Sequence, residues 1–349
     1  MERIEIRPGY SISRVIKGGW HLAGGHGQIE EAQAIDDMLA FVEAGITTFD
    51  CADIYTGVET LIGKFLKKHH DAFQSGNLPP VQVHTKYVPD LNALGSLTQA
   101  DTTRIIDRSL QRLGVERLDL VQFAWWDYDF ENYVDVALHL KALQDQGKIR
   151  HIGVTNFDGQ RLGEIREAGV NVVANQVQYS VLDQRARREM ESMAVEQNIP
   201  FLCYGVVAGG FLSDRYLGVP DPTPPFENRS LTKYRLIIDE FGNYEVFQAM
   251  LRCLRSIADN YEVGIAEVAS RYVLQQSGVG GLIIGARNRR HLERLIKLDQ
   301  FELDPEDIDR IEKLVAQSKG PQGPFYALER EKGGRHAAIM KYNLNEPGA

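Results

Sequence analysis

Short apolar segments alternate with amphipathic segments along most of this chain, and this alternation limits the possible folds more than any other feature. It predicts eight strands, at residues 14–20, 46–50, 81–86, 118–126, 149–156, 172–178, 200–206 and 280–286. Seven of them lead directly into a segment with helical periodicity. Strands that alternate with helices form a parallel sheet whose faces the helices cover.

Eight such units favour closure of the sheet into a (β/α)₈ barrel. The competing architecture is an open, doubly wound sheet, which carries a GxGxxG motif after its first strand. The stretch KGGWHLAGGHG (17–27) has its glycines at other spacings, so we predict the barrel. We expect one domain over 1–349, with a β-hairpin at 1–13, the barrel at 14–318 and a tail at 319–349 over the barrel mouth. A long loop, 207–243, is also expected to cover the mouth.

Composition excludes several classes of protein. The net charge of −9 and the lack of a basic stripe argue against binding to nucleic acid or to an anionic membrane. Three distant cysteines, with no CxxC, suggest reduced thiols and predict neither disulfides nor a metal site. The chain opens with no signal-like leader and has no apolar run of the ~18 residues needed for a membrane span. We therefore expect a soluble, cytoplasmic protein.

Three polar residues lie at or just beyond the ends of neighbouring predicted strands. Asp50 ends one strand, Tyr55 lies in the following loop, and Lys86 ends the next strand. Singly, they fit a helix cap, a packing residue and a solvated charge. Together they suggest catalysis, because the carboxyl ends of parallel strands meet at one edge. An ammonium lowers the pKa of a nearby phenol, and a carboxylate balances the buried ammonium. Tyr55 could then protonate an alkoxide formed when a cofactor delivers hydride to a carbonyl.

Several motifs resemble those of the aldo-keto reductases, in the same order, over roughly residues 14–318. They are FDCADIYTGVETLIG (49–63), HTKY (84–87), LDLVQF (118–123), GVTNF (153–157), NQVQYS (175–180) and IIGARNRRHL (283–292). The resemblance implies a (β/α)₈ barrel closed at its bottom by the N-terminal hairpin. It also implies reversible, NADP(H)-dependent reduction of aldehydes and ketones, without metal or flavin.

The resemblance also assigns site residues. The implied catalytic residues are Asp50, Tyr55 and Lys86. The implied cofactor site comprises Gly19 and Trp20 at the pocket entrance, Asp50, the carboxamide-binding Thr155, Asn156 and Gln176, the stacking Tyr204 with Gly205, and the 2′-phosphate segment Gly285, Ala286, Arg287, Asn288 and His291. The implied substrate pocket comprises Trp20, Ala124, Trp125 and Trp126. A preference for NADP over NAD rests mainly on Arg287 and its neighbours.

The sequence departs from the family pattern at three places. Ala124 replaces a histidine that gives a second hydrogen bond to the substrate oxygen. Gly205 replaces a frequent serine, and His291, Arg294 and Leu295 replace residues that contact the adenine. For Ala124 three interpretations are open: a natural subgroup that uses Tyr55 alone or with water, a deliberate inactivating substitution, or a substrate that fills the space.

Function therefore also has alternatives. The main hypothesis is the NADP(H)-dependent reductase acting on a small carbonyl or alcohol substrate. The absence of the histidine favours an NADPH-binding sensor or partner subunit with little catalysis. A third hypothesis is an enzyme that oxidises sugars or other hydroxyl compounds.

Overall fold

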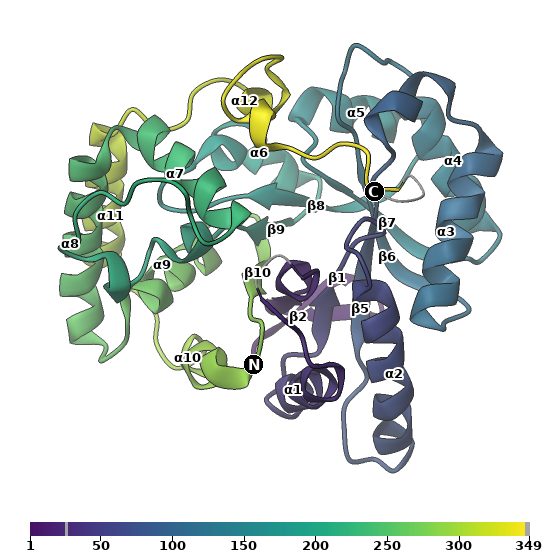
Figure 1. The fold of residues 1–349 in the computed structure, drawn as a ribbon, viewed down its shortest axis with the longest axis horizontal. Coiled ribbons are helices and arrows are strands. Elements are labelled where there is room, and N and C mark those ends of the chain that lie inside the picture. The colour runs from purple at the N-terminus through teal and green to yellow at the C-terminus, as the bar shows by residue number, and fades with distance from the viewer. Residues whose placement is uncertain (25–26, 346–349) are drawn as a thin grey trace.

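The computed structural model describes residues 1–24 and 27–345, and its centre is a closed barrel of parallel strands (Figure 1). Around the barrel the strand order is β10-β3-β4-β5-β6-β7-β8-β9. The strands are β3 (Val15–Gly18), β4 (Thr48–Asp50), β5 (Gln82–Tyr87), β6 (Leu118–Ala124), β7 (Ile149–Thr155), β8 (Val172–Gln178), β9 (Phe201–Tyr204) and β10 (Val279–Gly285). The predicted eight-stranded barrel is confirmed.

Helices cover the outside of this barrel (Figure 1). The helices are α1 (Glu31–Glu43), α2 (Val58–Gln74), α3 (Gln99–Leu113), α4 (Tyr133–Asp145), α5 (Gly159–Glu167), α6 (Arg185–Glu196), α7 (Arg229–Phe241), α8 (Tyr244–Asn260), α9 (Ile265–Leu274), α10 (Leu292–Lys297), α11 (Pro305–Gln317) and, in the C-terminal tail over the mouth, α12 (Ala327–Arg330). Local sequence sets many of their ends. Helix α3, for example, begins with a capping box between Thr98 and Asp101 and ends at Gly114, whose φ is +67°. None of the helices in the described residues is long and apolar enough to cross a membrane.

A hairpin of β1 (Arg3–Arg7) and β2 (Tyr10–Ser13) precedes the barrel, as predicted. Its buried side chains Ile6, Tyr10 and Ile12 join a core cluster with Leu120 and Leu202, which come from barrel strands. The Tyr10 hydroxyl lies 3.0 Å from His84 Nε2 in β5. His84 precedes Lys86 by two residues on the same face of the strand, so the hairpin closes the end of the barrel opposite the mouth.

The segment 207–243 is not the irregular loop that the sequence suggested, because its second half is helix α7. Asn228 caps this helix through a hydrogen bond from Leu231 N. Its apolar residues Leu231, Tyr234 and Ile238 recur at helical spacing and are buried. That spacing was visible in the sequence, but the proline-rich stretch 220–225 before it suggested a loop.

The C-terminal tail runs from α12 back across the barrel to the C-terminal mark in Figure 1, where it is drawn in yellow. Near its end the Asn345 side chain donates to Val88 O at 2.7 Å, and Leu91 N donates to Tyr342 O at 3.2 Å. Tyr342 also packs edge-on against Trp126, with ring centroids 5.1 Å apart. The tail thus reaches the loops that follow β5 and β6.

Candidate active site

A buried ion pair lies at the mouth of the barrel, at the ends of β4 and β5. Lys86 Nζ lies 2.6 Å from Asp50 Oδ2 and donates to Cys51 O at 2.8 Å. Both side chains are nearly inaccessible to solvent. Burial lowers the pKa of Lys86, but Asp50 and then Tyr55 raise it by more, so the pKa lies above its ordinary value. Lys86 is therefore held as a cation.

Two buried amide side chains also donate hydrogen bonds to Asp50. Gln122 Nε2 donates to Asp50 Oδ1 at 2.9 Å, and Gln176 Nε2 donates to the same oxygen at 2.7 Å. Gln176 Nε2 also donates to Gln122 Oε1 at 2.8 Å. Each amide comes from a different strand, so Asp50 is fixed from three sides. A fully satisfied buried network of this kind keeps the carboxylate in one position.

Tyr55 lies in the turn after β4, beside this pair. Lys86 Nζ is 5.2 Å from the centroid of its ring, and the Trp20 ring centroid is 5.1 Å away. Burial raises the pKa of Tyr55 while the Lys86 ammonium lowers it, and the net pKa lies above its ordinary value. The sequence predicted only the effect of Lys86. The expected lowering is outweighed because the desolvation of a buried phenolate costs more.

Asn156, Tyr204 and Gln176 meet next to the same network. Tyr204 OH donates to Asn156 Oδ1 at 2.8 Å, and Asn156 N donates to Gln176 O at 2.9 Å. Asn156 has a left-handed backbone, with φ of +61°. Thr155 is buried one residue earlier, at the end of β7. These residues were predicted to hold the nicotinamide, and the structure brings them together.

Gly19 and Gly205 each allow a close approach of the chain at the mouth. A Cβ on Gly19 would lie 2.8 Å from Asp50 O, the atom to which Gly19 N donates. Gly205 has φ of +73°, and a Cβ there would collide with the hydroxyl oxygen of Tyr234 in α7. The departure from serine at Gly205 therefore has a structural cause: the Tyr234 side chain occupies the space.

The opposite end of the site is exposed and positively charged. After β10, Asn288 Oδ1 accepts a hydrogen bond from Arg290 N and starts the turn that leads into α10. Arg289 is half exposed and pairs with Asp37 Oδ1 at 3.0 Å. His291 and Arg290 are exposed side chains beside the cavity. Leu295, one of the residues that depart from the family pattern, is buried in the core.

One cavity of about 900 Å³ joins the two ends. Of the predicted site residues, those that line it are Trp20, Asp50, Tyr55, Lys86, Ala124, Trp125, Trp126, Thr155, Asn156, Gln176, Tyr204, Gly205, Gly285, Arg287, Asn288 and His291. Gly19 and Ala286 are adjacent in sequence to lining residues but do not themselves line the cavity. The predicted residues therefore form one continuous site.

Comparison with known proteins identifies the family of the chain. Residues 14–316 match the model of the Aldo/keto reductase family. The chain belongs to the aldo/keto reductase family. It is therefore an oxidoreductase that acts on carbonyl compounds.

The following relatives of this aldo/keto reductase are less than 30% identical to it. The aldo-keto reductase YhdN of Bacillus subtilis is 27% identical over 325 residues, which cover 91% of this chain and 95% of that protein. The NADH-specific methylglyoxal reductase of Escherichia coli is 25% identical and covers 79% of this chain and 86% of its own length. Among solved structures, the glycerol dehydrogenase AKR11B4 of Gluconobacter oxydans superposes with a TM-score of 0.76 at 23% identity, over 92% of this chain and 98% of that one.

The departure at Ala124 leaves a gap that no histidine fills. Ala124 is the last residue of β6 and lines the cavity. His84 lies deeper in the barrel and contacts Tyr10 of the hairpin, and burial lowers its pKa to about 4. His21 packs against Gly285, the last residue of β10. This aldo/keto reductase therefore has no imidazole beside Tyr55 among its described residues.

The two predicted pocket tryptophans differ. Trp125 is only 1% exposed, and its indole N–H donates to Phe130 O within the surrounding core. Trp126 is more exposed, donates to Pro89 O, and packs against Tyr342 of the tail. Trp126 is the better candidate for contact with a substrate.

Gln122 was not predicted as a site residue, whereas the segment that contains α7 and the C-terminal tail were both expected to cover the mouth. Gln122 lies two residues before Ala124, so strand alternation alone could have placed it on the same inward face. Lys233, Tyr234, Tyr326 and Met340 line the cavity from segments far away in sequence. Lys233 Nζ lies 4.9 Å from the centroid of the Tyr204 ring.

Proposed function

We propose that this aldo/keto reductase is an NADP(H)-dependent enzyme that reduces an aldehyde or ketone, with Tyr55 as the proton donor. The observation that carries the proposal is the buried Lys86–Asp50 pair beside the Tyr55 ring, at the bottom of a cavity large enough for a dinucleotide. Lys86 favours the phenolate that forms when Tyr55 gives up its proton. Asp50 keeps Lys86 charged and in place.

The residues around the cavity fit a dinucleotide. The lining has eight cationic residues and four acidic ones, although the whole chain carries a net charge of −9. The cations are Lys86, Arg215, Arg229, Lys233, Arg287, Arg290, Arg294 and Lys341, and the acids are Asp50, Asp214, Glu227 and Glu267. A cationic lining suits an anionic ligand with several phosphates. Asn156, Gln176 and Thr155 would hold the carboxamide, Tyr204 would stack on the ring, and Arg287 to His291 would hold the adenosine end.

When bound, the reduced nicotinamide supplies the hydride. Tyr55 then gives its proton to the substrate oxygen. Trp20, Trp126, Ile54, Val88 and Met340 line the cavity with apolar surface, which orients the rest of the substrate and excludes water. NADP is proposed over NAD because of the arginines after Gly285, although one relative is named as NADH-specific. A cytoplasmic location and the absence of nucleic-acid and membrane partners stay predictions of the sequence.

The test is the Tyr55→Phe variant. We expect NADPH oxidation against a panel of aldehydes and ketones to be abolished, while NADPH affinity, measured by fluorescence titration, hardly changes. Undiminished turnover in this variant would refute the role of Tyr55.

The alternative is an NADPH-binding sensor or partner subunit, and Ala124 is the observation that favours it. The same panel decides between the two when it is run on the unmodified chain and on Ala124→His. Tight NADPH binding without turnover in either protein would favour the binding role. Oxidation of sugars or other alcohols with NADP⁺ tests the reverse reaction.

A further inference from the structure

The C-terminal tail brings an acidic and a basic residue, Glu329 and Arg330, to the ends of three barrel strands. Both lie at the end of α12, which follows Tyr326. Glu329 pairs with Arg185 at the start of α6, which is linked through Asp183 to the end of β8. Arg330 reaches backbone atoms just after β6 and β7. The tail therefore joins strand ends that are separate in sequence.

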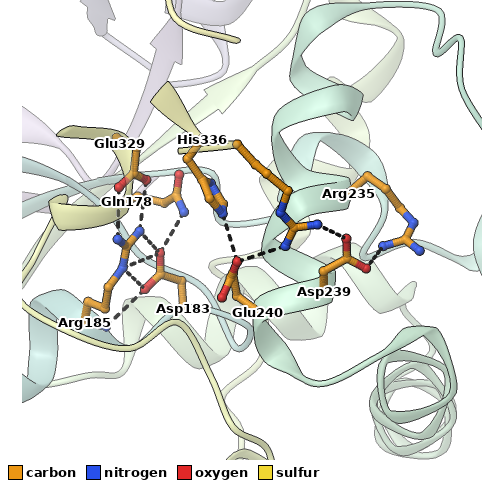
Figure 2. Close-up of polar contacts among 9 residues, drawn as sticks. Gln178, Asp183, Arg185, Arg235, Asp239, Glu240, Glu329 and His336 are labelled. Carbon is orange, nitrogen blue, oxygen red and sulfur yellow. Dashed lines mark hydrogen bonds and ion pairs between the residues drawn. The ribbon is translucent and has the colours of Figure 1, made fainter. Parts of the chain in front are cut away.

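Glu329 anchors this end of the tail in a fully buried ion-pair network, shown in Figure 2. Arg185 donates to Glu329 Oε2 at 2.9 Å and to Oε1 at 3.0 Å, and it also pairs with Asp183 at 2.8 Å. Gln178, the last residue of β8, donates to Asp183 Oδ2 at 2.7 Å. Paired donors of this kind fix orientation as well as position. Arg330, the residue after Glu329, is therefore held in a defined position.

Arg330 bridges two backbone carbonyls at the mouth. Its Nη2 donates to Trp125 O at 2.9 Å and to Asn156 O at 2.7 Å. The guanidinium carbon lies 4.1 Å from the centroid of the Tyr128 ring and 4.9 Å from that of Tyr326. The two aromatic rings keep the guanidinium over the strand ends.

The hydrogen bonding of Arg330 is incomplete, which is not expected of a residue whose main role is to stabilise the fold. Its Nε and Nη1 are buried without a hydrogen-bond partner among the described residues. A buried charged group with unsatisfied donors stabilises a fold poorly. What Arg330 does provide is a third hydrogen bond to Asn156, whose backbone is left-handed. The other two join Asn156 N to Gln176 O and Tyr204 OH to Asn156 Oδ1.

We propose that Arg330, anchored through Glu329, is a positioning residue that fixes Asn156 and thereby the nicotinamide end of the dinucleotide site. The inference rests on the proposed function, because Asn156 acts there through the nicotinamide carboxamide. The tail is then part of the cofactor site, in addition to forming a wall of the substrate pocket.

The test is Arg330→Met in the full chain, which keeps an apolar side chain between the two tyrosine rings. We expect the dissociation constant of NADPH to rise about tenfold and kcat to fall by a similar factor. Binding of 2′-phospho-ADP-ribose, which lacks nicotinamide, should stay unchanged, and so should the thermal unfolding midpoint. Arg330→Lys should restore only part of the NADPH affinity, because an ammonium lacks the planar geometry of the guanidinium.

The matched control is Lys332→Met, two residues further on, where an exposed ammonium pairs with Asp127 and Asp129. This variant should behave as the unmodified protein in every assay. Unchanged NADPH affinity and kcat in Arg330→Met would overturn the proposal. So would an equal loss of affinity for NADPH and the fragment, or a clear fall in the unfolding midpoint, since both indicate a merely structural role. If the unmodified protein binds no NADPH, the proposed function fails instead.

Discussion

The two ends of the cavity are built in different ways. At the inner end, Asp50 accepts from one ammonium and two amides and is only 3% exposed. At the outer end, Arg289 is 54% exposed and pairs with Asp37, while Arg290 is exposed beside it. Charges interact more strongly where water is excluded, and salt screens them where water has access. The inner end therefore holds the catalytic side chains in fixed positions. At the outer end, each exposed charge contributes less to the binding of a charged ligand.

Lys86→Met removes the cation at the inner end of the cavity and should have the largest effect on stability and turnover in this comparison. It leaves the Asp50 carboxylate buried without its cation, which typically costs about 3–5 kcal/mol of unfolding free energy. Turnover should fall by up to ~10²–10⁴-fold, the usual contribution of proton transfer by a positioned group, because the proton donor Tyr55 loses the cation that favours its phenolate. Urea denaturation and NADPH oxidation measure the two effects.

The matched control is Lys148→Met, which removes a surface pair with Asp107. An exposed pair contributes at most about 1 kcal/mol, so this variant should stay close to the unmodified protein. Equal losses of stability in the two variants would remove the distinction between buried and exposed pairs.

Ala124→His changes the inner end of the cavity by adding a second hydrogen-bond donor beside the substrate oxygen. One such donor can change kcat by ~10²–10³-fold, so we expect kcat to rise by about 10²-fold. The affinity for NADPH should not change. Ala124→Leu is the control, since it fills the space without a hydrogen-bond donor. A similar gain in the leucine variant would show that filling the gap, and not the donor, matters.

Asp53 is a second buried carboxylate, three residues after Asp50, and its hydrogen bonds come from neutral groups. It accepts from Val88 N and from the Asn345 amide, and burial, followed by the nearby Glu59, raises its pKa to about 7. Because the folded state holds this proton more tightly than the unfolded state, stability should fall as pH rises from about 4 to 7. The fall is at most about 1.4 kcal/mol per pH unit.

Asp53→Asn should remove this part of the pH dependence. Urea denaturation of both proteins from pH 5 to 8 gives the difference between their free energies of unfolding. The contributions of all titrating groups that the two proteins share cancel in this difference. Parallel stability curves would mean that Asp53 does not titrate in this range.

Arg290→Ala probes the outer end and should have the smallest effect. We expect the dissociation constant of NADPH to rise about fivefold, close to 1 kcal/mol, and that of NADH to stay the same. Raising the salt concentration should reduce the effect. Arg289→Ala is the neighbouring control and should change affinity less, because Asp37 already pairs with that guanidinium. An equal loss for NADH would contradict a 2′-phosphate contact.

Much of the fold was predictable because it depends on local rules. Strand and helix periodicity predicted all eight barrel strands and the hairpin, and a glycine with positive φ ends α3. The prediction was wrong at α7, where a proline-rich stretch hid a periodic segment. The site residues at strand ends were also predictable, because the carboxyl ends of parallel strands always meet at one edge.

The sequence by itself determined the barrel and placed Asp50, Tyr55 and Lys86 together, because alternation and strand polarity are encoded residue by residue. Only the tertiary structure decided what surrounds them: the amide of Gln122, the Tyr234 ring that excludes a side chain at Gly205, and the Arg330 bridge from the tail. Only the structure could decide the balance of charge and burial that raises the pKa of Tyr55. These contacts join residues far apart in the chain, and their strength depends on how much water the final packing excludes.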